Sequence, residues 1–265
     1  MSPNAHALPD AGTSALATLD TDVLGFVADM YGIQLDQLAA LLTDRGEAAG
    51  NAGQRARDAV AHWRDLGYVE LGQLSVGEPW IWATRAGLEA FGLKSRRFQP
   101  GKSWLRHTRA VTEVRLALER TSAWRASGAS WRSERQIRSV LGSISRDEHV
   151  PDAEVHWPGP DGSPRGGGIW AVEVELTRKT VERTATIMRE ALARTGEYGC
   201  PPGGMTAPGQ PPRYAGVSYI CSPQAVRVIR SSRAELGAVL ARRVVVHELP
   251  ESAMRLTGPK RGWQP

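Results

Sequence analysis

Two short segments of alternating apolar and acidic residues constrain this chain more than any other feature. Residues 149–155 read His-Val-Pro-Asp-Ala-Glu-Val, and residues 169–176 read Ile-Trp-Ala-Val-Glu-Val-Glu-Leu. Alternation with a period of two and many β-branched residues are typical of β-strands. The intervening residues, 157–168, are rich in Gly and Pro, which is the composition of a hairpin loop. The sequence therefore predicts two adjacent antiparallel strands.

The acidic residues of these strands are expected to share one face of the sheet. Because side chains alternate along a strand, Glu173 and Glu175 point to the same side, and the hairpin brings Asp152 from the neighbouring strand. Carboxylates that come together repel one another, and a divalent cation with oxygen ligands relieves that repulsion. The stretch therefore indicates a metal site. The alternative is a solvated face whose acids pair with nearby Arg and Lys.

Pro151-Asp152 followed by Glu173-Val174-Glu175 resembles the PD-(D/E)xK signature of metal-dependent nucleases. The resemblance implies that Asp152 and Glu173 hold Mg²⁺ or Mn²⁺, and that Glu134 completes the metal site or its outer shell. Glu175 or Lys179 would orient or deprotonate the attacking water. The position that usually holds Lys in this signature is Glu175, so Lys179, expected on the next helix, would supply the missing cation.

The second half of the chain is predicted to follow the αβββαβ order of that nuclease core. The expected elements are a helix over 103–120, a strand over 130–137, the two acidic strands, a helix over 178–195, a strand over 214–221, a helix over 222–239 and a strand over 243–249. On the first helix, Glu113 is either the helical glutamate that many such nucleases place near the metals or a surface residue. His107 is either a base or a packed or capping residue.

Residues 21–92 are predicted to form a winged-helix domain. Three short helices, over 22–31, 33–42 and 52–66, carry apolar stripes, and a hairpin follows. The junctions around Gly67 and Gly87 resemble those of winged-helix regulators, which implies that the third helix enters the major groove of double-stranded DNA. An ordinary solvated face or a protein-interaction module is the alternative. The residues expected to contact DNA are Gln54, Arg55, Arg57 and Arg64 on this helix and Lys94, Arg96, Arg97 and Lys102 after it.

Residues 93–102 are basic and contain Pro100, which is typical of a domain boundary that can also lie along phosphates, or of a plain linker. The nuclease-like domain is then expected over 103–250. Residues 1–20 are predicted to be a disordered tail, and residues 251–265 a second tail. The fold class is α/β in the α+β sense: a winged helix followed by a restriction-endonuclease-like core.

A formal net charge of +5 and a pI of about 9.5 favour a polyanionic partner such as DNA. Neither Cys200 nor Cys221 lies in a CxxC motif, which argues against a zinc knuckle or a disulfide scaffold. The sequence shows no run of about 18 apolar residues and no signal-peptide pattern. We therefore expect a soluble cytoplasmic protein associated with the nucleoid or a plasmid, without a membrane partner. A homodimer is left open.

The chain as a whole resembles the replication-relaxation family of plasmid and mobile-element proteins. The matching segments are Leu66–Val69, Leu105–His107, Trp131–Arg135, Pro151–Ala153 and Glu173–Thr177. The resemblance implies a role in DNA replication, relaxation or transfer, with nicking or cleavage of phosphodiester bonds by the acidic site.

Two other classes of function stay open. The first is a DNA-binding regulator or replication accessory protein whose nuclease-like core has lost catalysis, which the absence of Lys after Glu173 favours. The second is a relaxase with a tyrosine nucleophile, for which Tyr198, Tyr214 and Tyr219 are the candidates. The chain lacks the His-hydrophobic-His cluster of the familiar relaxases.

Overall fold

The computed structural model describes residues 18–75, 77–94, 99–141, 149–159, 167–196 and 212–249. The chain divides into two compact units after Arg120. One sheet has three strands in the order β1-β3-β2, and the other has five in the order β4-β5-β6-β7-β8. Helices with two sheets make this a mixed α/β protein, which agrees with the α+β class. No helix in the described ranges is long and apolar enough to cross a membrane.

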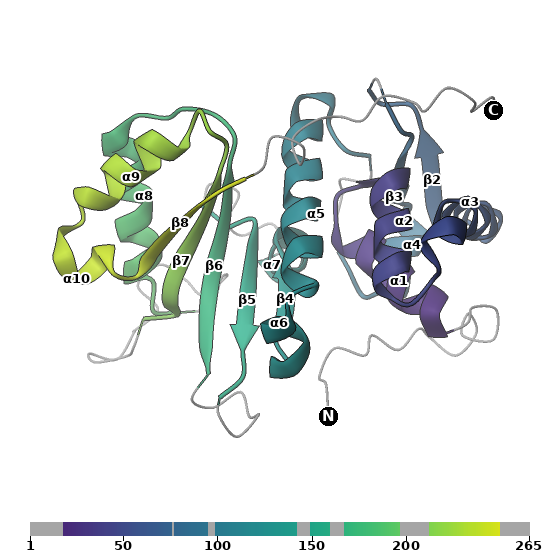
Figure 1. Ribbon diagram of the computed structural model, residues 1–265, viewed down its shortest axis with the longest axis horizontal. Coiled ribbons are helices and arrows are strands. Elements are labelled where there is room, and N and C mark those ends of the chain that lie inside the picture. The colour runs from purple at the N-terminus through teal and green to yellow at the C-terminus, as the bar shows by residue number, and fades with distance from the viewer. Residues whose placement is uncertain are drawn as a thin grey trace. The chain divides into compact units, whose positions relative to one another are not determined.

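The first unit contains three helices and a hairpin in the predicted order, followed by further helices (Figure 1). Its elements are α1 (Thr18–Asp29), β1 (Ile33–Gln34), α2 (Leu35–Asp44), α3 (Ala49–Asp65), β2 (Val69–Gly72), β3 (Trp80–Ala83), α4 (Arg85–Ala90), the short 3-10 helix η2 (Lys102–Trp104) and α5 (Leu105–Glu119). The second helix begins later than predicted, because Ile33 and Gln34 pair with β3 as a short strand.

Two glycines shape the junctions around the hairpin. Gly67, between α3 and β2, has a φ of +77°, which L-residues with a side chain rarely adopt. Gly87 lies so close to the carbonyl oxygen of Tyr68 that a Cβ atom at this position would fall 2.1 Å from it. Both positions therefore require glycine, for different reasons.

Helix α5 belongs to the first unit, although residues 103–120 were expected to begin the second domain. Arginines of the helix and of its C-cap hold it to α1 and α2: Arg109 pairs with Asp36 at 2.9 Å, Arg115 with Asp29 at 3.3 Å and the C-cap Arg120 with Asp44 at 2.7 Å. Arg109 and Arg115 are buried, so these contacts are poorly screened by solvent. The pairs join residues more than seventy positions apart, which no local pattern indicates.

The second unit is a five-stranded mixed sheet with helices. Strands β4 (Ser130–Ser133), β5 (Ala153–Trp157) and β6 (Gly168–Glu175) are antiparallel neighbours, which confirms the predicted hairpin. Strands β7 (Tyr214–Cys221) and β8 (Val244–Glu248) continue the sheet parallel to β6. The helices are α6 (Ser122–Ser127), α7 (Glu134–Leu141), α8 (Val181–Ala193), α9 (Val226–Ala234) and α10 (Gly237–Ala241).

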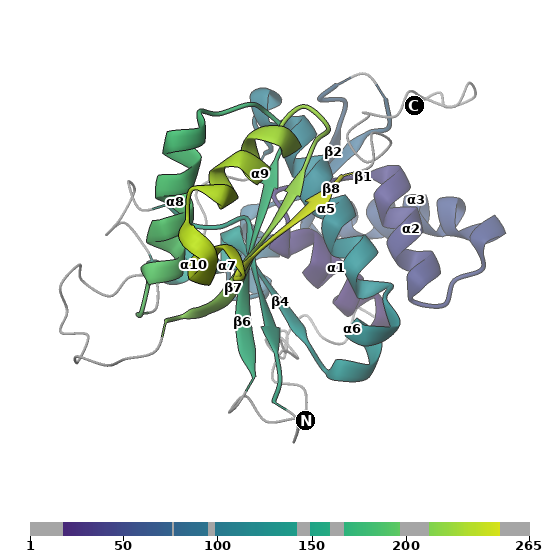
Figure 2. The same ribbon diagram turned by 60° about the vertical axis from the view of Figure 1, so that its left-hand side comes forward.

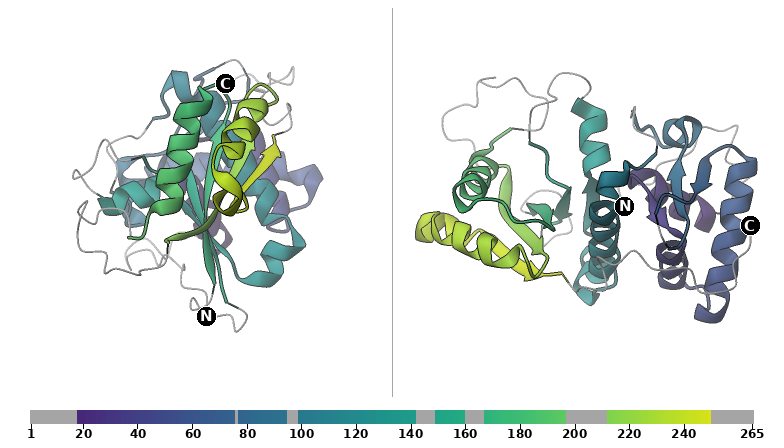
Figure 3. Two further views of the ribbon diagram at one scale, coloured as in Figure 1. Left: turned by 90° about the vertical axis from the view of Figure 1, so that its left-hand side faces the viewer. Right: turned by 90° about the horizontal axis from the view of Figure 1, so that it is seen from above.

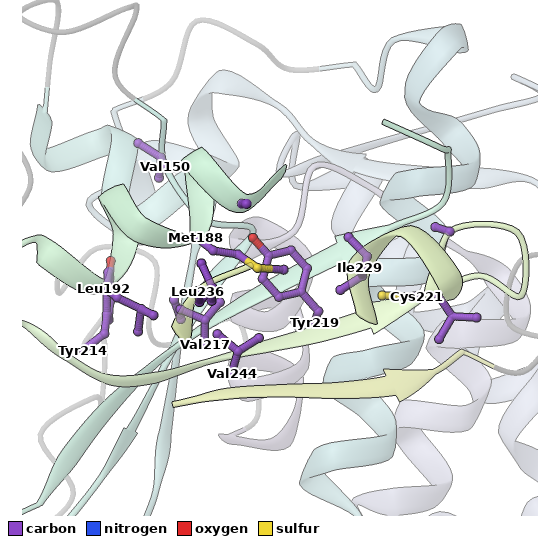
Figure 4. Packing of buried hydrophobic residues seen from close by; sticks show 14 of the residues in the cluster. Val150, Met188, Leu192, Tyr214, Val217, Tyr219, Cys221, Ile229, Leu236 and Val244 are labelled. Atoms are coloured by element: carbon purple, nitrogen blue, oxygen red, sulfur yellow. The ribbon is translucent and has the colours of Figure 1, made fainter. Parts of the chain in front are cut away.

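Helices α8 and α9 cover one face of this sheet, as Figure 2 and the left view of Figure 3 show. Each connects two parallel strands, which is the usual use of a helical crossover. Their apolar sides pack on β7: Met188 and Leu192 from α8 and Ile229 from α9 lie in one buried cluster with Val217 and Tyr219 (Figure 4). This core fixes the strand ends that carry the acidic residues.

Two helix starts differ from the prediction because of capping. The strand expected over 130–137 ends at Ser133, whose hydroxyl accepts a hydrogen bond from the amide of Gln136 while the Gln136 side chain accepts one from the amide of Ser133. This reciprocal pair is a capping box, so α7 begins at Glu134. Helix α8, predicted to start at residue 178, begins at Val181, because the hydroxyl of Thr180 caps it by accepting a hydrogen bond from the amide of Arg183.

Candidate active site

Asp152 and Glu173 come from neighbouring strands and face each other. Ala153 pairs with Val172, and in an antiparallel ladder this register places Asp152, the residue before β5, opposite Glu173. The Oδ2 atom of Asp152 accepts a hydrogen bond of 2.7 Å from the amide of Val174. That bond fixes the Asp152 carboxylate at the edge of β6.

Glu173 and Glu175 lie on the face of the sheet that α8 and α9 cover. In the parallel pairing Glu173 is the partner of Tyr219 and Glu175 that of Cys221, and both partners belong to the buried core. The side chains of Glu173 and Glu175 are only 14% and 11% exposed. The simple alternative, a fully solvated acidic face, therefore does not describe this site.

His149 is also a member of the site, although no role was predicted for it. Its Nε2 atom lies 2.7 Å from Oε1 of Glu173. This hydrogen bond raises the pKa of His149. Burial raises the pKa of Glu173, the bond to His149 opposes that rise, and the charge of Asp152 adds to it. Glu173 is thus a carboxylate whose charge is costly unless a cationic group lies beside it.

Glu175 and Lys179 form an ion pair at the end of β6. Oε1 of Glu175 also accepts hydrogen bonds from the amide and the hydroxyl of Thr177, at 3.2 and 3.1 Å. The predicted proximity of Lys179 to the acids is present, but Lys179 lies in the loop before α8 and not on the helix. The loop therefore brings an ammonium group to the acidic edge.

The prediction that Glu134 lies on a strand beside the other acids is wrong. Glu134 opens α7, and its carboxylate pairs with Arg138 one turn later at 2.5 Å. Its backbone is still close to the site, because the amide of Glu134 donates a 2.9 Å hydrogen bond to the carbonyl of Asp152. The sequence Ser133-Glu134-Arg135-Gln136 carried the signal for this helix start.

A second buried acid, Glu154 on β5, was not predicted. It is fully buried, and its carboxylate accepts hydrogen bonds from Arg213, at 2.9 and 2.8 Å, and from the hydroxyl of Tyr214 at 2.9 Å. His156 lies 3.0 Å away. Burial opposes ionisation, but His156 and Arg213 outweigh it and lower the pKa of Glu154 to about 2. Because the Glu154 carboxylate is held by partners within the protein, we interpret this network as a contribution to the stability of the fold.

The helical candidates Glu113 and His107 lie in the first unit. Glu113 accepts a 2.9 Å hydrogen bond from Gln37 and lies 3.3 Å from Arg109, so its carboxylate belongs to the contacts that hold α5 to α2. His107 meets the ring of Trp104 edge-on, with centroids 5.8 Å apart. These contacts agree with the packed and surface interpretations of the two residues.

Some of the residues predicted to contact DNA are engaged with other side chains, and others are exposed. Arg55 pairs with Asp20 at 2.5 Å, and Arg57 donates to the side chain of Gln54, which in turn donates to Asp58. Exposed side chains among the others are those of Arg64, Lys94 and Lys102. Arg96 and Arg97 lie outside the described residues. The exposed side of α3 thus carries both signs of charge.

Two tyrosine candidates are poorly suited to nucleophilic attack. Tyr214 and Tyr219 are buried, and the hydroxyl of Tyr214 donates a hydrogen bond to Glu154. Burial raises the pKa of Tyr219 well above its usual value, and the charges of Glu173 and Glu175 add to the rise. A phenolate at Tyr219 would be strongly disfavoured. Tyr198 lies outside the described residues.

A magnesium ion fits the donor chemistry at the Asp152–Glu173 edge. In the described part of the chain, no group of three or more His, Cys, Asp or Glu side chains is placed to hold a metal ion. Mg²⁺, however, is usually bound through one or two carboxylates and keeps several waters. Asp152 and Glu173 supply two carboxylates, which is the number that such a site needs.

A family model described as replication-relaxation matches residues 24–200, from α1 to beyond the end of α8. The matched stretch includes Asp152, Glu173, Glu175 and Lys179. No curated protein and no solved structure gives a significant match to the chain.

Proposed function

The chain belongs to the replication-relaxation family, which indicates a role in the replication or relaxation of a plasmid or other mobile element, and we propose that it acts there as a metal-dependent DNA endonuclease. The observation that carries the proposal is the β5–β6 register, which places Asp152 opposite Glu173, with Lys179 paired to Glu175 and His149 to Glu173. The second unit is then a nuclease-like core in which β4, β5 and β6 are antiparallel neighbours and β7 follows through α8, with the helix α7 inserted between β4 and β5.

The residues of this edge have distinct roles in the proposed reaction. Asp152 and Glu173 would hold Mg²⁺, which supplies an activated water and stabilises charge on the scissile phosphate. The amide of Val174 orients the Asp152 carboxylate. Lys179, held by Glu175, places an ammonium group where negative charge develops. His149 holds Glu173 in place and takes up a proton beside it.

The proposal is tested by nicking of supercoiled plasmid with the full chain. Nicked or linear product is expected with Mg²⁺ or Mn²⁺, and none with EDTA. Without a metal ion, the carboxylates of Asp152 and Glu173 cannot activate a water or stabilise the charge on the phosphate. Cleavage that persists in EDTA would contradict the metal-dependent reaction. A covalent protein–DNA adduct under the same conditions would indicate the tyrosine route instead.

A second candidate is a nuclease-fold protein that binds DNA without cutting it. Every acid of the site already has a protein partner: Asp152 has the Val174 amide, Glu173 has His149, and Glu175 has Lys179. Duplex binding without cleavage in any divalent metal would establish this regulator or accessory role.

We interpret the first unit as a winged helix whose α3 contacts the duplex, on the support of three helices followed by the β2–β3 hairpin. Arg57→Ala is expected to weaken duplex binding and to flatten its salt dependence by about 0.9 in the log–log slope, the value for one lost phosphate contact. Fluorescence anisotropy across a salt series measures both. Ala61→Ser, on the exposed side of the same helix, is the control. An unchanged slope for Arg57→Ala would refute the helix assignment.

A further inference from the structure

The positive charge of the chain is concentrated after residue 92. Residues 21–92 contain five Arg, no Lys and ten Asp or Glu, whereas residues 93–265 contain 28 Lys or Arg and 16 Asp or Glu. Attraction to a nucleic-acid backbone depends on such charge, because affinity rises with each phosphate that Lys or Arg neutralises. The region around α3 is therefore a poor source of the main electrostatic attraction.

The few arginines of that region are also largely engaged. Arg45 pairs with Asp22 at 2.7 Å, Arg55 with Asp20 at 2.5 Å and Arg85 with Glu89 at 2.8 Å. A guanidinium already paired with a carboxylate releases fewer counterions when a phosphate approaches. This leaves α3 suited to a few local contacts, which set register or read bases.

Helices α8 and α9 and the loop before α8 carry a different set of arginines, here called the arginine surface: Arg178, Arg183, Arg189 and Arg227. All four are exposed, and within the described residues none of them forms an ion pair with a carboxylate. Residues 178–194 and 222–243 together contain ten Lys or Arg and three Asp or Glu. The surface thus presents unneutralised positive charge.

The arginine surface is one continuous part of the second unit. Arg178 donates a 3.0 Å hydrogen bond from Nε to the carbonyl of Gln224, and Arg189 donates one of 2.9 Å to the carbonyl of Glu235. Figure 2 shows α8 and α9 on the same side of the sheet. The two bonds hold the β6–α8 loop and α8 against the start and end of α9.

The arginine surface begins at the strand ends that carry the acids. The amide of Ser222 donates to the carbonyl of Glu175, and the Ser222 hydroxyl donates to that of Leu176, both at 2.9 Å. The loops leaving β6 and β7 are therefore joined at the carboxyl edge of the parallel strands, where open α/β sheets usually bind ligands. Arg178 follows Leu176 by two positions and Arg227 follows Ser222 by five, so we expect a backbone bound on them to lie beside this edge.

We propose that the second unit grips the phosphate backbone of double-stranded DNA on the arginine surface and so presents a phosphodiester to Asp152 and Glu173. The inference deepens the proposed function, on which it rests for DNA as the substrate. It assigns the main electrostatic affinity to α8, α9 and the loop before α8, and leaves to α3 the contacts that set register.

The test compares full-length variants by fluorescence anisotropy on a labelled duplex over a salt series. Arg183→Ala with Arg227→Ala should lower the log–log salt slope by about 1.8 and weaken binding about 30-fold at 0.15 M salt, since each lost phosphate contact removes about 0.9. The corresponding double Lys variant should recover most of the slope. Arg242→Ala, exposed at the opposite end of the sheet before β8, is the control for the loss of one positive charge elsewhere and should bind as the wild type does.

The outcomes separate this inference from the proposed nuclease activity. Weakened binding in the double variant supports the arginine surface even if the wild type never nicks plasmid. Wild-type affinity and slope in the double variant overturn it, even if plasmid is cut. Absence of duplex binding by the wild type also overturns it. A slope loss of about 0.9 with Arg242→Ala, half of that expected for the double variant, would reduce the effect to net charge and overturn the localised surface.

Discussion

Replacing Asp152 with Asn is expected to lower the rate of plasmid cleavage by roughly three orders of magnitude while leaving duplex affinity nearly unchanged. Asn keeps a carbonyl oxygen that can accept the hydrogen bond from the Val174 amide, so the local geometry is preserved. It removes the negative charge that would hold the metal ion. A bound metal supplies several kcal/mol of transition-state stabilisation, and each loss of about 1.4 kcal/mol is a factor of ten in rate.

The measurement is a time course of nicking in Mg²⁺, with a calorimetric titration of Mn²⁺ into the same proteins. Glu173→Gln should behave like Asp152→Asn in both, whereas Glu190→Gln, an exposed acid on α8, should match the wild type. An Asp152→Asn protein that still nicks at the wild-type rate would rule out the assigned site. Unchanged Mn²⁺ binding by Asp152→Asn would show that Asp152 is not a metal ligand, whatever its role in cleavage.

Replacing Glu154 with Ala is expected to lower the free energy of unfolding by about 3–5 kcal/mol, the usual effect of removing one partner from a buried ion pair. The variant leaves Arg213, whose side chain is 5% exposed, without its carboxylate. The same network makes the free energy of unfolding depend on pH. Because the folded pKa is lowered from 4.5 to about 2, the contribution of Glu154 is complete above pH 4.5 and is lost as the pH falls towards 2.

Urea unfolding at several pH values between 7 and 2.5 measures both effects. The lowered pKa of Glu154 corresponds to a contribution of about 3 kcal/mol to the free energy of unfolding at neutral pH. The wild type should therefore lose stability in acid more steeply than Glu154→Gln does. Glu190→Gln should follow the wild type. If Glu154→Gln and the wild type showed parallel pH profiles, Glu154 would not be ionised and paired in the folded protein.

The local parts of the fold were predictable because they depend on neighbours in the sequence. Alternation on both sides of a Gly/Pro-rich loop gave the β5–β6 hairpin, and with it the meeting of Asp152 and Glu173. The helix at Glu134 was missed although Ser133 and Gln136 have the spacing of a capping box, so that error was avoidable.

The long-range contacts were not predictable in the same way. Glu154 meets Arg213 across 59 positions, and Arg109 joins α5 to Asp36 across 73. Each partner alone looks like an ordinary charged residue, because only the folded chain removes water from around it. His149 is intermediate: it stands in the acidic stretch, but its contact with Glu173 depends on the strand register.

Strand β6 is the middle strand of its sheet, with β5 on one side and β7 on the other. Backbone groups in such a strand are bonded on both edges and are among the last to open in native-state fluctuations, whereas edge strands fray first. We therefore expect the backbone that carries Glu173 to be among the slowest-exchanging of the second unit. Fraying at β4 or β8 can loosen the margins of the sheet without disturbing the spacing of its carboxylates.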